Sequence, residues 1–175
     1  MSRKTEVLIA GGGPAGLSAA IVAGELGAKV LLVDDNPVLG GQLIKQTHRF
    51  FGSSARDAGI RGFTIADKLQ EDMAKLKNVT VMKETAVVGL YGDSKAGILS
   101  LERYEAVDFE RVVICTGATE NSLNFDNNDL PGIYGAGAVQ TLMNVHGIKP
   151  GKKILMVGSG NIGLIVSYQL IQAGV

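Results

Sequence analysis

The sequence predicts an α/β fold built on a mainly parallel β-sheet, and three observations support this prediction. An apolar run at Val7–Ala10 is followed by a glycine-rich turn, an Ala- and Leu-rich stretch and a second apolar run at Val30–Val33. Further short apolar runs occur at Val79–Met82 and Val112–Ile114. The stretch Ile154–Val175 repeats the first pattern. Continuous apolar runs are typical of parallel strands that are buried on both faces, so we expect a buried strand at each of them.

The first glycine turn, Gly11–Gly16, has the residue types that a dinucleotide site requires. Gly11 permits a tight turn, Gly13 lets a diphosphate approach the backbone, and Gly16 lets the following helix lie close to the strand. Pro14 lies in the first turn of that helix, where its missing N–H costs least. The unpaired N–H groups and the dipole of the helix then face the phosphates.

Asp34 follows the second apolar run, close to the spacing of about 20 residues at which an acid accepts hydrogen bonds from adenosine ribose hydroxyls. Asp35 is a weaker candidate for the same role. Gly27 is expected to end the intervening helix. Because strand, turn, helix, strand and acid occur in this order, we predict a dinucleotide site in a Rossmann-like unit rather than a glycine-rich structural turn.

Later segments give weaker patterns. Gly40-Gly41-Gln42-Leu43 fits either close backbone approach beside a ring system or an ordinary polar loop. No periodicity holds from Ile44 to Arg61, and His48 in this stretch fits a structural role better than that of a general base. A helix is predicted over 64–77, with capping-box spacing at Thr64 and Asp67. A hairpin near 86–91 and 98–101 and a short helix near 136–145 follow.

Composition limits the classes of function. The chain has 175 residues, of which 46% are apolar and 19% charged, as in a globular domain. Its 17 basic and 17 acidic residues cancel, so nucleic acid is not an expected partner. Without a signal-peptide pattern, a cytoplasmic location is expected. The uncharged stretch Ile154–Val175 contains glycines that favour a buried strand-turn-helix over a membrane span. We predict no metal site and no membrane partner.

The glycine turn, Asp34, Gly40-Gly41-Gln42-Leu43 and Thr116-Gly117-Ala118 together resemble the FAD-binding half of the pyridine nucleotide-disulfide oxidoreductase superfamily. The resemblance is strongest to thioredoxin-reductase-like flavoproteins and to the alpha subunits of complexes that oxidise sarcosine, opines or proline. It implies a Rossmann-like FAD-binding domain with a parallel sheet and a small β-meander. It covers nearly the whole chain and does not specify the substrate.

The resemblance also implies roles for particular residues. The FAD diphosphate would be held by the first glycine turn, Ala15 included, and the adenosine ribose by Asp34. Gly41 and Gln42 would lie on the flavin side of the cofactor, and Val87 would contact adenine through its backbone. Thr116 and Gly117 match the point at which the chain leaves the flavin domain beside the cofactor.

One feature departs from the family pattern. Cys115 is the single cysteine, so the chain cannot form an internal redox disulfide, and disulfide reduction is excluded unless a missing part supplies the thiols. Cys115 is interpreted as a small buried apolar residue. No side chain is a convincing acid, base or nucleophile, and we assign no catalytic residue.

The repeat places a second glycine turn, Gly158–Gly163, over the first one, with Gly158, Gly160 and Gly163 as its glycines. In the family such a turn opens an NAD(P)H-binding domain. We expect an FAD-binding domain over 1–120, a linker over 121–151, and a truncated second domain over 152–175. Since a lone strand and helix cannot bury both faces of a sheet, we interpret the chain as a fragment that binds FAD weakly or not at all.

The leading functional expectation is an FAD-dependent oxidoreductase that transfers hydride between NAD(P)H or a small amine substrate and the flavin. One alternative is a non-catalytic nucleotide-binding subunit of a multi-subunit amine dehydrogenase. Another is a simple NAD(P)-dependent dehydrogenase that uses the first turn alone. A small-molecule substrate and a second subunit or a homodimer are the expected partners.

Overall fold

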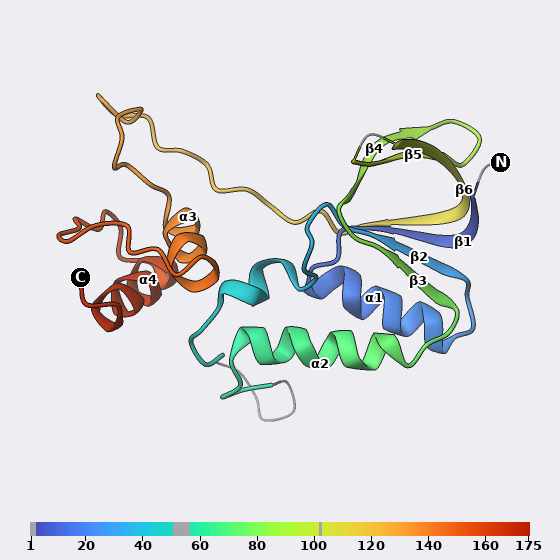
Figure 1. The fold of residues 1–175 in the computed structure, drawn as a ribbon, viewed down its shortest axis with the longest axis horizontal. Coiled ribbons are helices and arrows are strands. Elements are labelled where there is room, and N and C mark those ends of the chain that lie inside the picture. The colour runs from blue at the N-terminus through green and yellow to red at the C-terminus, as the bar shows by residue number, and fades with distance from the viewer. Residues whose placement is uncertain (1–2, 51–56, 102) are drawn as a thin grey trace. The chain divides into compact units, whose positions relative to one another are not determined.

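The computed structural model describes residues 3–50, 57–101 and 103–175, and it divides into two compact units. Unit 1 contains Met1–Ile44 and Gly62–Gly117, and unit 2 contains Lys45–Arg61 and Ala118–Val175. The stretch 45–61 therefore clusters with the C-terminal third of the chain, although the residues on both sides of it in sequence belong to unit 1. Figure 1 shows the chain coloured by residue number.

Unit 1 is an α/β unit whose sheet contains six strands in the described part of the chain, in the order β3-β2-β1-β6-β5-β4. Strands β1, β2, β3 and β6 pair in parallel, whereas β5 pairs antiparallel with both β4 and β6. The elements are β1 (Arg3–Ala10), α1 (Pro14–Glu25), β2 (Val30–Val33), the 3₁₀ helix η1 (Gly41–Lys45, which ends in unit 2), α2 (Gly62–Ala74), β3 (Val79–Met82), β4 (Thr85–Tyr91), β5 (Lys95–Ser100) and β6 (Arg103–Ile114). The predicted α/β class, parallel sheet and small meander are confirmed.

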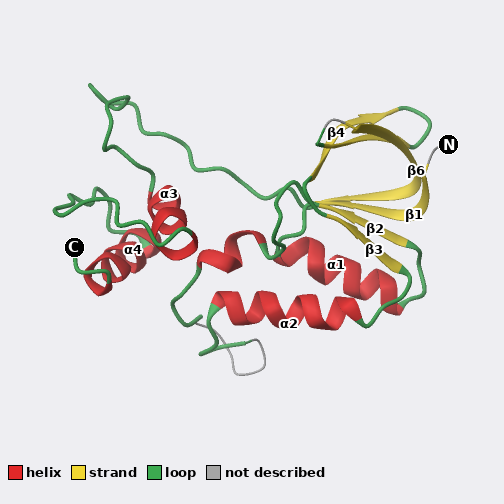
Figure 2. Ribbon diagram, viewed as in Figure 1, coloured by secondary structure: helices red, strands yellow, loops and turns green. Residues whose placement is uncertain are grey.

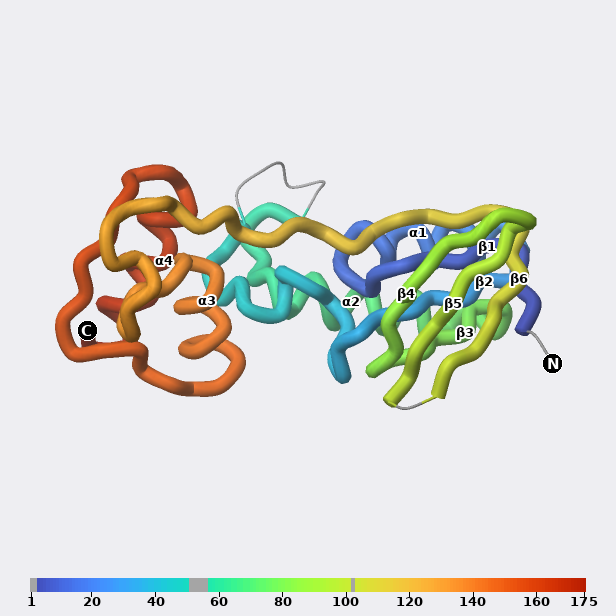
Figure 3. Tube along the Cα trace, turned by 90° about the horizontal axis from the view of Figure 1, so that it is seen from above, coloured from blue at the N-terminus to red at the C-terminus, as the bar shows by residue number. Residues whose placement is uncertain are grey.

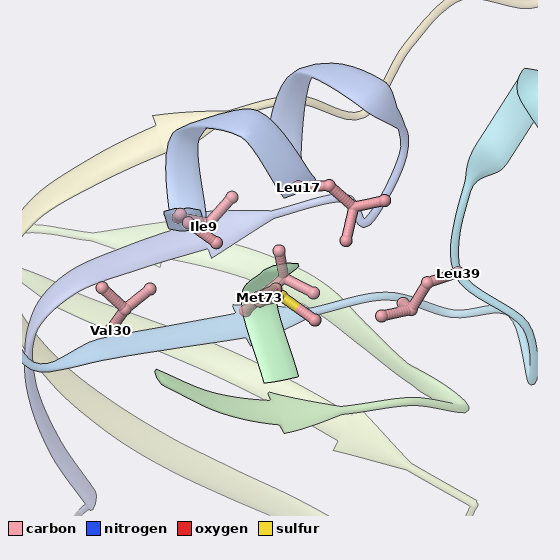
Figure 4. Close-up of a cluster of buried hydrophobic side chains, with 7 residues drawn as sticks. Ile9, Leu17, Val30, Leu39 and Met73 are labelled. Atoms are coloured by element: carbon pink, nitrogen blue, oxygen red, sulfur yellow. The ribbon is translucent and has the colours of Figure 1, made fainter. Parts of the chain in front are cut away.

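The parallel strands separate two apolar clusters, because successive side chains of a strand point to opposite faces. Ile9, Val30 and Leu32 pack on one face with residues of α1 and α2, among them Leu17 and Met73. Figure 4 shows this cluster, which Leu39 closes at one end. On the opposite face, buried strand residues pack against the meander, and the cluster consists of Leu8, Leu31, Val33, Ala96, Ile98 and Val107. Unit 1 thus has three layers, with helices on one side and β4 and β5 on the other (Figures 1 and 2).

The meander differs in detail from the sequence prediction. Strand β6 is longer than the predicted run Val112–Ile114, and it runs beside β5, which in turn runs beside β4 (Figure 3). The prediction that this run is buried was wrong, since Val112 and Val113 are half-buried and Ile114 is 63% exposed. Tyr91 and Tyr104 lie over Gly89 and Gly97 on the exposed face, where a methyl group on either glycine would meet a tyrosine ring. Their hydroxyl oxygens are 3.5 Å apart.

Helix α2 was predicted at residues 64–77 and begins two residues earlier, at Gly62. The capping-box assignment was wrong, because Thr64 lies inside the helix and not at its N-cap. The predicted apolar face is present: Met73 is buried and Leu69 packs against the same cluster. Arg61, the residue before the helix, forms an isolated antiparallel bridge with Arg49.

Unit 2 contains α3 (Ala136–Gln140), the π-helical turn η3 (Thr141–Val145) and α4 (Asn161–Gln172). The predicted helix near 136–145 is confirmed, with a π-helical second half. Glu120 accepts hydrogen bonds from the N–H groups of Ala136 (3.0 Å) and Gly137 (3.1 Å), so its carboxylate satisfies the start of α3. A small core of Val139, Val166 and Leu170 joins α3 to α4.

The predicted buried strand before the second glycine turn was wrong. Residues 152–158 form no strand, and Leu155 and Val157 are 88% and 76% exposed. A strand needs a hydrogen-bonded neighbour, and no strand of unit 2 is present in its described part to supply one. No helix among the described residues is both long and apolar enough to cross a membrane.

Candidate dinucleotide site

The first glycine turn connects β1 to α1 at the carboxyl end of the parallel sheet, beside the end of β6. Gly11 has φ +104°, and a methyl group on it would lie 2.2 Å from the carbonyl oxygen of Cys115. The N–H of Cys115 donates to the carbonyl of Ala10 at 2.7 Å. Gly16 is equally constrained, because its methyl group would lie 1.8 Å from the Gly11 carbonyl oxygen. Both glycines are therefore required by the packing of the protein itself.

Gly13, unlike Gly11 and Gly16, is not required by the packing of the protein. Its φ of −73° and ψ of −174° are extended values that any residue adopts. A methyl group on Gly13 would meet only the Cα atom of Gly41, at an ordinary distance of 3.8 Å. Gly13 is also the N-cap of α1, and its carbonyl accepts the N–H of Leu17 at 2.9 Å. The backbone at Gly13 is thus open at the point where helix N–H groups are unpaired, which fits the close approach of a diphosphate.

The Gly-Gly loop lies directly against the first turn. The N–H of Gly40 donates to the carbonyl of Gly12 at 2.8 Å. A methyl group on Gly41 would lie 2.9 Å from the Cα of Gly13. Gly40 and Gly41 have φ values of +116° and +50°. The two glycine segments therefore pack backbone against backbone.

Asp34 faces the turn. Its side chain is buried, with 8% exposure, and its Oδ2 atom accepts the N–H of Gly12 at 2.5 Å. Its Oδ1 atom accepts the backbone N–H of Asn36 at 2.8 Å and the Asn36 side-chain amide at 3.1 Å. Asp35 is exposed at the same strand end, and its Oδ1 atom accepts the Asn36 amide at 2.9 Å. Of the two predicted ribose acids, Asp34 therefore contacts the glycine turn, whereas Asp35 contacts Asn36.

The other predicted residues of unit 1 are less closely grouped. Thr116 and Gly117 are exposed and follow Cys115, whose carbonyl contacts Gly11. Gln42 is exposed within η1. Val87 lies on β4, pairs with Ile98 and packs against the cluster on the meander side of the sheet. The strand that carries it begins near the acids, because the N–H of Thr85 donates to the carbonyl of Asp34 at 3.0 Å.

The second glycine turn has the same backbone geometry as the first. Gly158 has φ +110°, and Gly160 is the N-cap of α4 with φ −70°. A methyl group on Gly163 would lie 2.7 Å from the Gly158 carbonyl oxygen, whereas nothing lies within 4 Å of one on Gly160. Nothing lies within 4 Å of a methyl group on Gly158 either, so Gly158 is constrained by its positive φ alone, whereas Gly163 is constrained by contact.

His48 lies in unit 2 and stacks on Phe50, with ring centroids 5.3 Å apart. Burial lowers the pKa of His48 below its usual value. Its Nδ1 atom is buried and has no hydrogen-bond partner in the described part of the chain. No cluster of three potential metal ligands occurs among the described residues.

Sequence reasoning missed three residues that shape the first turn. Gly12 donates to Asp34, and Leu39 fills the space beside Gly12, where a methyl group would lie 2.5 Å from the Leu39 Cδ2 atom. Asn36 donates to both acids. The Asp-Asp-Asn-Pro sequence, 34–37, was a turn signal that could have pointed to Asn36, because asparagine side chains commonly bond to nearby backbone in turns. No comparable signal marks Leu39.

Comparison with known proteins agrees with this geometry. The chain is 30% identical over 97% of its length to the alpha subunit of sarcosine oxidase from Rhizobium meliloti (strain 1021), of which it covers 18%. It is 28% identical over 97% of its length to one of the subunits of opine oxidase from Agrobacterium tumefaciens (strain Ach5), of which it covers 35%. The structure of L-proline dehydrogenase from P. horikoshii matches 99% of the chain with a TM-score of 0.84 and 26% identity, and the match covers 34% of that protein.

A thioredoxin reductase from Lactococcus lactis shares the fold over 71% of the chain, with a TM-score of 0.59 and 24% identity, and the match covers 39% of that protein. The chain thus spans about a fifth to two fifths of the relatives named here. The pyridine nucleotide-disulphide oxidoreductase family matches residues 5–175, which is nearly the whole sequence. With an α/β unit that carries a glycine turn, an apposed Gly-Gly loop and an acid at the end of β2, this chain belongs to the pyridine nucleotide-disulphide oxidoreductase family of flavin-dependent enzymes.

Proposed function

We propose that this chain forms the nucleotide-binding part of an FAD-dependent oxidoreductase, which transfers hydride between NAD(P)H or a small amine substrate and the flavin. The observation that carries the proposal is the open backbone at Gly13, between two glycines that the fold itself requires. Nothing in the described protein explains why this position lacks a side chain. A diphosphate that approaches the start of α1 explains it.

The residues of unit 1 divide among the parts of the cofactor. Gly11, Gly13, Pro14, Ala15 and Gly16 form the cradle for the diphosphate, and Asp34 and Asp35 accept from the ribose. Gly41 and Gln42 face the flavin side, with Thr116 and Gly117 beside them and the Val87 backbone near the adenine. Bound flavin would supply the hydride chemistry, while the protein supplies position and electrostatics.

The second glycine turn is proposed to bind NAD(P)H. Gly163 is constrained by contact as Gly16 is, Gly158 shares the positive φ of Gly11, and Gly160 is open as Gly13 is. The start of α4 then presents its unpaired N–H groups to a diphosphate. The amine substrate is proposed because the relatives include enzymes named for sarcosine, opines and proline.

A second candidate function is a nucleotide-binding subunit that performs no turnover by itself. The names of the relatives favour it, since the sarcosine oxidase and opine oxidase chains are both named as subunits of their enzymes. On this proposal the partner is a further polypeptide that carries the substrate site, or a second copy of the chain. Amine oxidation by the purified chain alone, at the rate of the complex, would contradict it.

Titration of the chain with ADP, FAD and NAD⁺, followed by amide NMR, tests the leading proposal. We expect ADP and FAD to shift the amide signals of Gly11, Gly12 and Gly13 and to compete with each other for one site. NMR is suitable because it detects weak binding. No shift with any nucleotide would sink the proposal, and a response to NAD⁺ but not to FAD would favour a simple NAD(P)-dependent dehydrogenase.

A further inference from the structure

Residues 45–48, which we call the strap, are joined to the helices of unit 2 by hydrogen bonds between polar side chains. The apolar side chains that form the core of unit 2 all come from residues 136–175. Beside this core, Gln140 on α3 and Gln169 on α4 are only 2% and 4% exposed. An amide buried to this extent is costly unless it is hydrogen-bonded, so both side chains need partners within the protein.

The partners form one directed chain of hydrogen bonds that ends on the strap. The Nε2 atom of Gln140 donates to the Oε1 atom of Gln169 at 3.0 Å. The Nε2 atom of Gln169 donates to the hydroxyl oxygen of Thr47 at 2.7 Å. The Nε2 atom of Gln46 donates to the Oε1 atom of Gln140 at a longer distance of 3.4 Å. The bond at Thr47 is therefore the closer of the two that tie the buried amides to the strap.

The strap is continuous with the Gly-Gly loop through η1. This helix begins at Gly41, which packs against Gly13, and it ends at Lys45, the first residue of the strap. The carbonyl of Lys45 accepts the side-chain amide of Asn144 at 2.7 Å, so the strap is held at this end as well. Fewer than two turns of 3₁₀ helix separate Gly41 from the strap. A displacement of the strap would therefore reach the Gly-Gly loop.

We infer that Gln140 and Gln169 are positioning residues for the proposed cofactor. Their hydrogen bonds fix the strap at Thr47, and the strap sets, through η1, the position of Gly41 and Gln42 on the flavin side. Apolar side chains would fill the two buried positions without the cost of burying amides, whereas directional hydrogen bonds hold the strap in one place. This inference rests on the proposed function and adds to it a dependence of flavin binding on unit 2.

The test compares the affinities of the chain for FAD and for ADP in calorimetric titrations. FAD should bind more tightly than ADP, because its flavin half adds contacts at Gly41 and Gln42. Thr47→Val removes the hydroxyl and leaves the Gln169 amide without its acceptor. It should lower the affinity for FAD roughly 5- to 20-fold and that for ADP by less than about twofold, since contacts within unit 1 shape the first glycine turn. Thr47→Ser keeps the hydroxyl and should restore the affinity for FAD.

A second pair of variants approaches the same bond from α4. Gln169→Leu should act as Thr47→Val does, and Gln172→Leu is the matched control, because Gln172 is exposed at the end of the same helix. Amide NMR of the ligand-free variants adds a direct readout. The signals of Gly41 and Gln42 should shift in Thr47→Val, while those of the first glycine turn stay in place. Urea unfolding of each variant is the folding control.

The outcomes separate the inference from the proposed function. If Thr47→Val bound FAD as the parent does, or lost affinity for FAD and ADP equally, the network would have a structural role only and the inference would be overturned. The same conclusion would follow if the parent bound FAD no more tightly than ADP. In each of these cases the proposed function stands, because ADP still binds. Failure of the parent to bind either nucleotide would overturn both.

Discussion

Replacing Gly13 with alanine separates the binding role of the first glycine turn from its structural role. The new methyl group would lie 3.8 Å from the Gly41 Cα atom, which is ordinary contact, and the backbone angles suit alanine. Alanine is a poorer N-cap than glycine, but it also reduces the entropy of the unfolded chain. We therefore expect the free energy of unfolding to change by no more than about 1 kcal/mol.

The effect on nucleotide binding should be much larger. A methyl group in front of the helix start occupies the space that the diphosphate needs, and overpacking of this kind costs about 1–3 kcal/mol. The affinity for ADP should accordingly fall by roughly 5- to 150-fold. The expected result is thus a chain that unfolds within about 4 °C of the parent but binds ADP far more weakly.

Calorimetric titration with ADP and thermal unfolding measured on the same preparations would check this expectation. Gly92→Ala is the matched control, because Gly92 lies in the β4–β5 turn and a methyl group there meets nothing within 4 Å, so it clashes no more than one on Gly13. Gly160→Ala tests the second glycine turn separately and should leave ADP binding at the first turn unchanged. If Gly13→Ala bound ADP as tightly as Gly92→Ala, the open position would have no role in binding, and the reasoning would be refuted.

Three further outcomes follow from other contacts. Gly16→Ala places a methyl group 1.8 Å from the Gly11 carbonyl oxygen and should destabilise the fold by about 3 kcal/mol or more in urea unfolding, so a loss below about 1 kcal/mol would contradict the packing argument. Asn78→Ala removes hydrogen bonds of 2.9 Å and 2.8 Å to the carbonyls of Gly24 and Ala28 and should cost about 1–3 kcal/mol, with unchanged stability as the opposing result. Burial lowers the pKa of His48, so the unfolded chain binds more protons near pH 6.5. Stability should therefore fall as the pH drops below about 6.5, and His48→Gln should flatten this dependence in pH-resolved unfolding; an equal slope in both proteins would exclude His48 as its source.

The parallel part of unit 1 was predictable because its elements are specified locally. The apolar runs at Val30–Val33 and Val79–Met82 match β2 and β3 at both ends. Helix α1 begins at Pro14, and Gly27 follows it with φ +87°. Continuous apolar strands, a proline at the helix start and a glycine after its end are signals that need no tertiary information.

The sequence predictions were wrong where the structure of a segment depends on contacts with residues distant in sequence. Ile154–Val157 has the composition of a buried strand, but a strand forms only beside another strand, and none in the described part of the chain pairs with it. Ile114 looks buried by composition, yet it is exposed at the end of β6. Thr64 has good capping spacing, but the helix begins at Gly62, directly after Arg61, which bridges to Arg49.

The candidate site was predictable as a motif but not as a set of contacts. The glycines and the acids could be placed from their spacing, since each has a backbone requirement that only a few residue types meet. Which of the two acids contacts the turn depends on the carboxylate that Gly12 reaches, and this is a property of the folded turn.

The separation of unit 1 into two stretches of sequence affects how the chain folds. Strands β1 and β2 come from the first stretch, whereas β3 and β6 come from the second, and residues 45–61 lie between them in the other unit. Strands β1 and β2 can pair within the first stretch, but β3 and β6 can join them only after this excursion has been closed into a loop, which costs entropy. We expect refolding to be slow at this step. A cut within 45–61 would leave two pieces, which must associate before β6 can pair with β1 beside the first glycine turn.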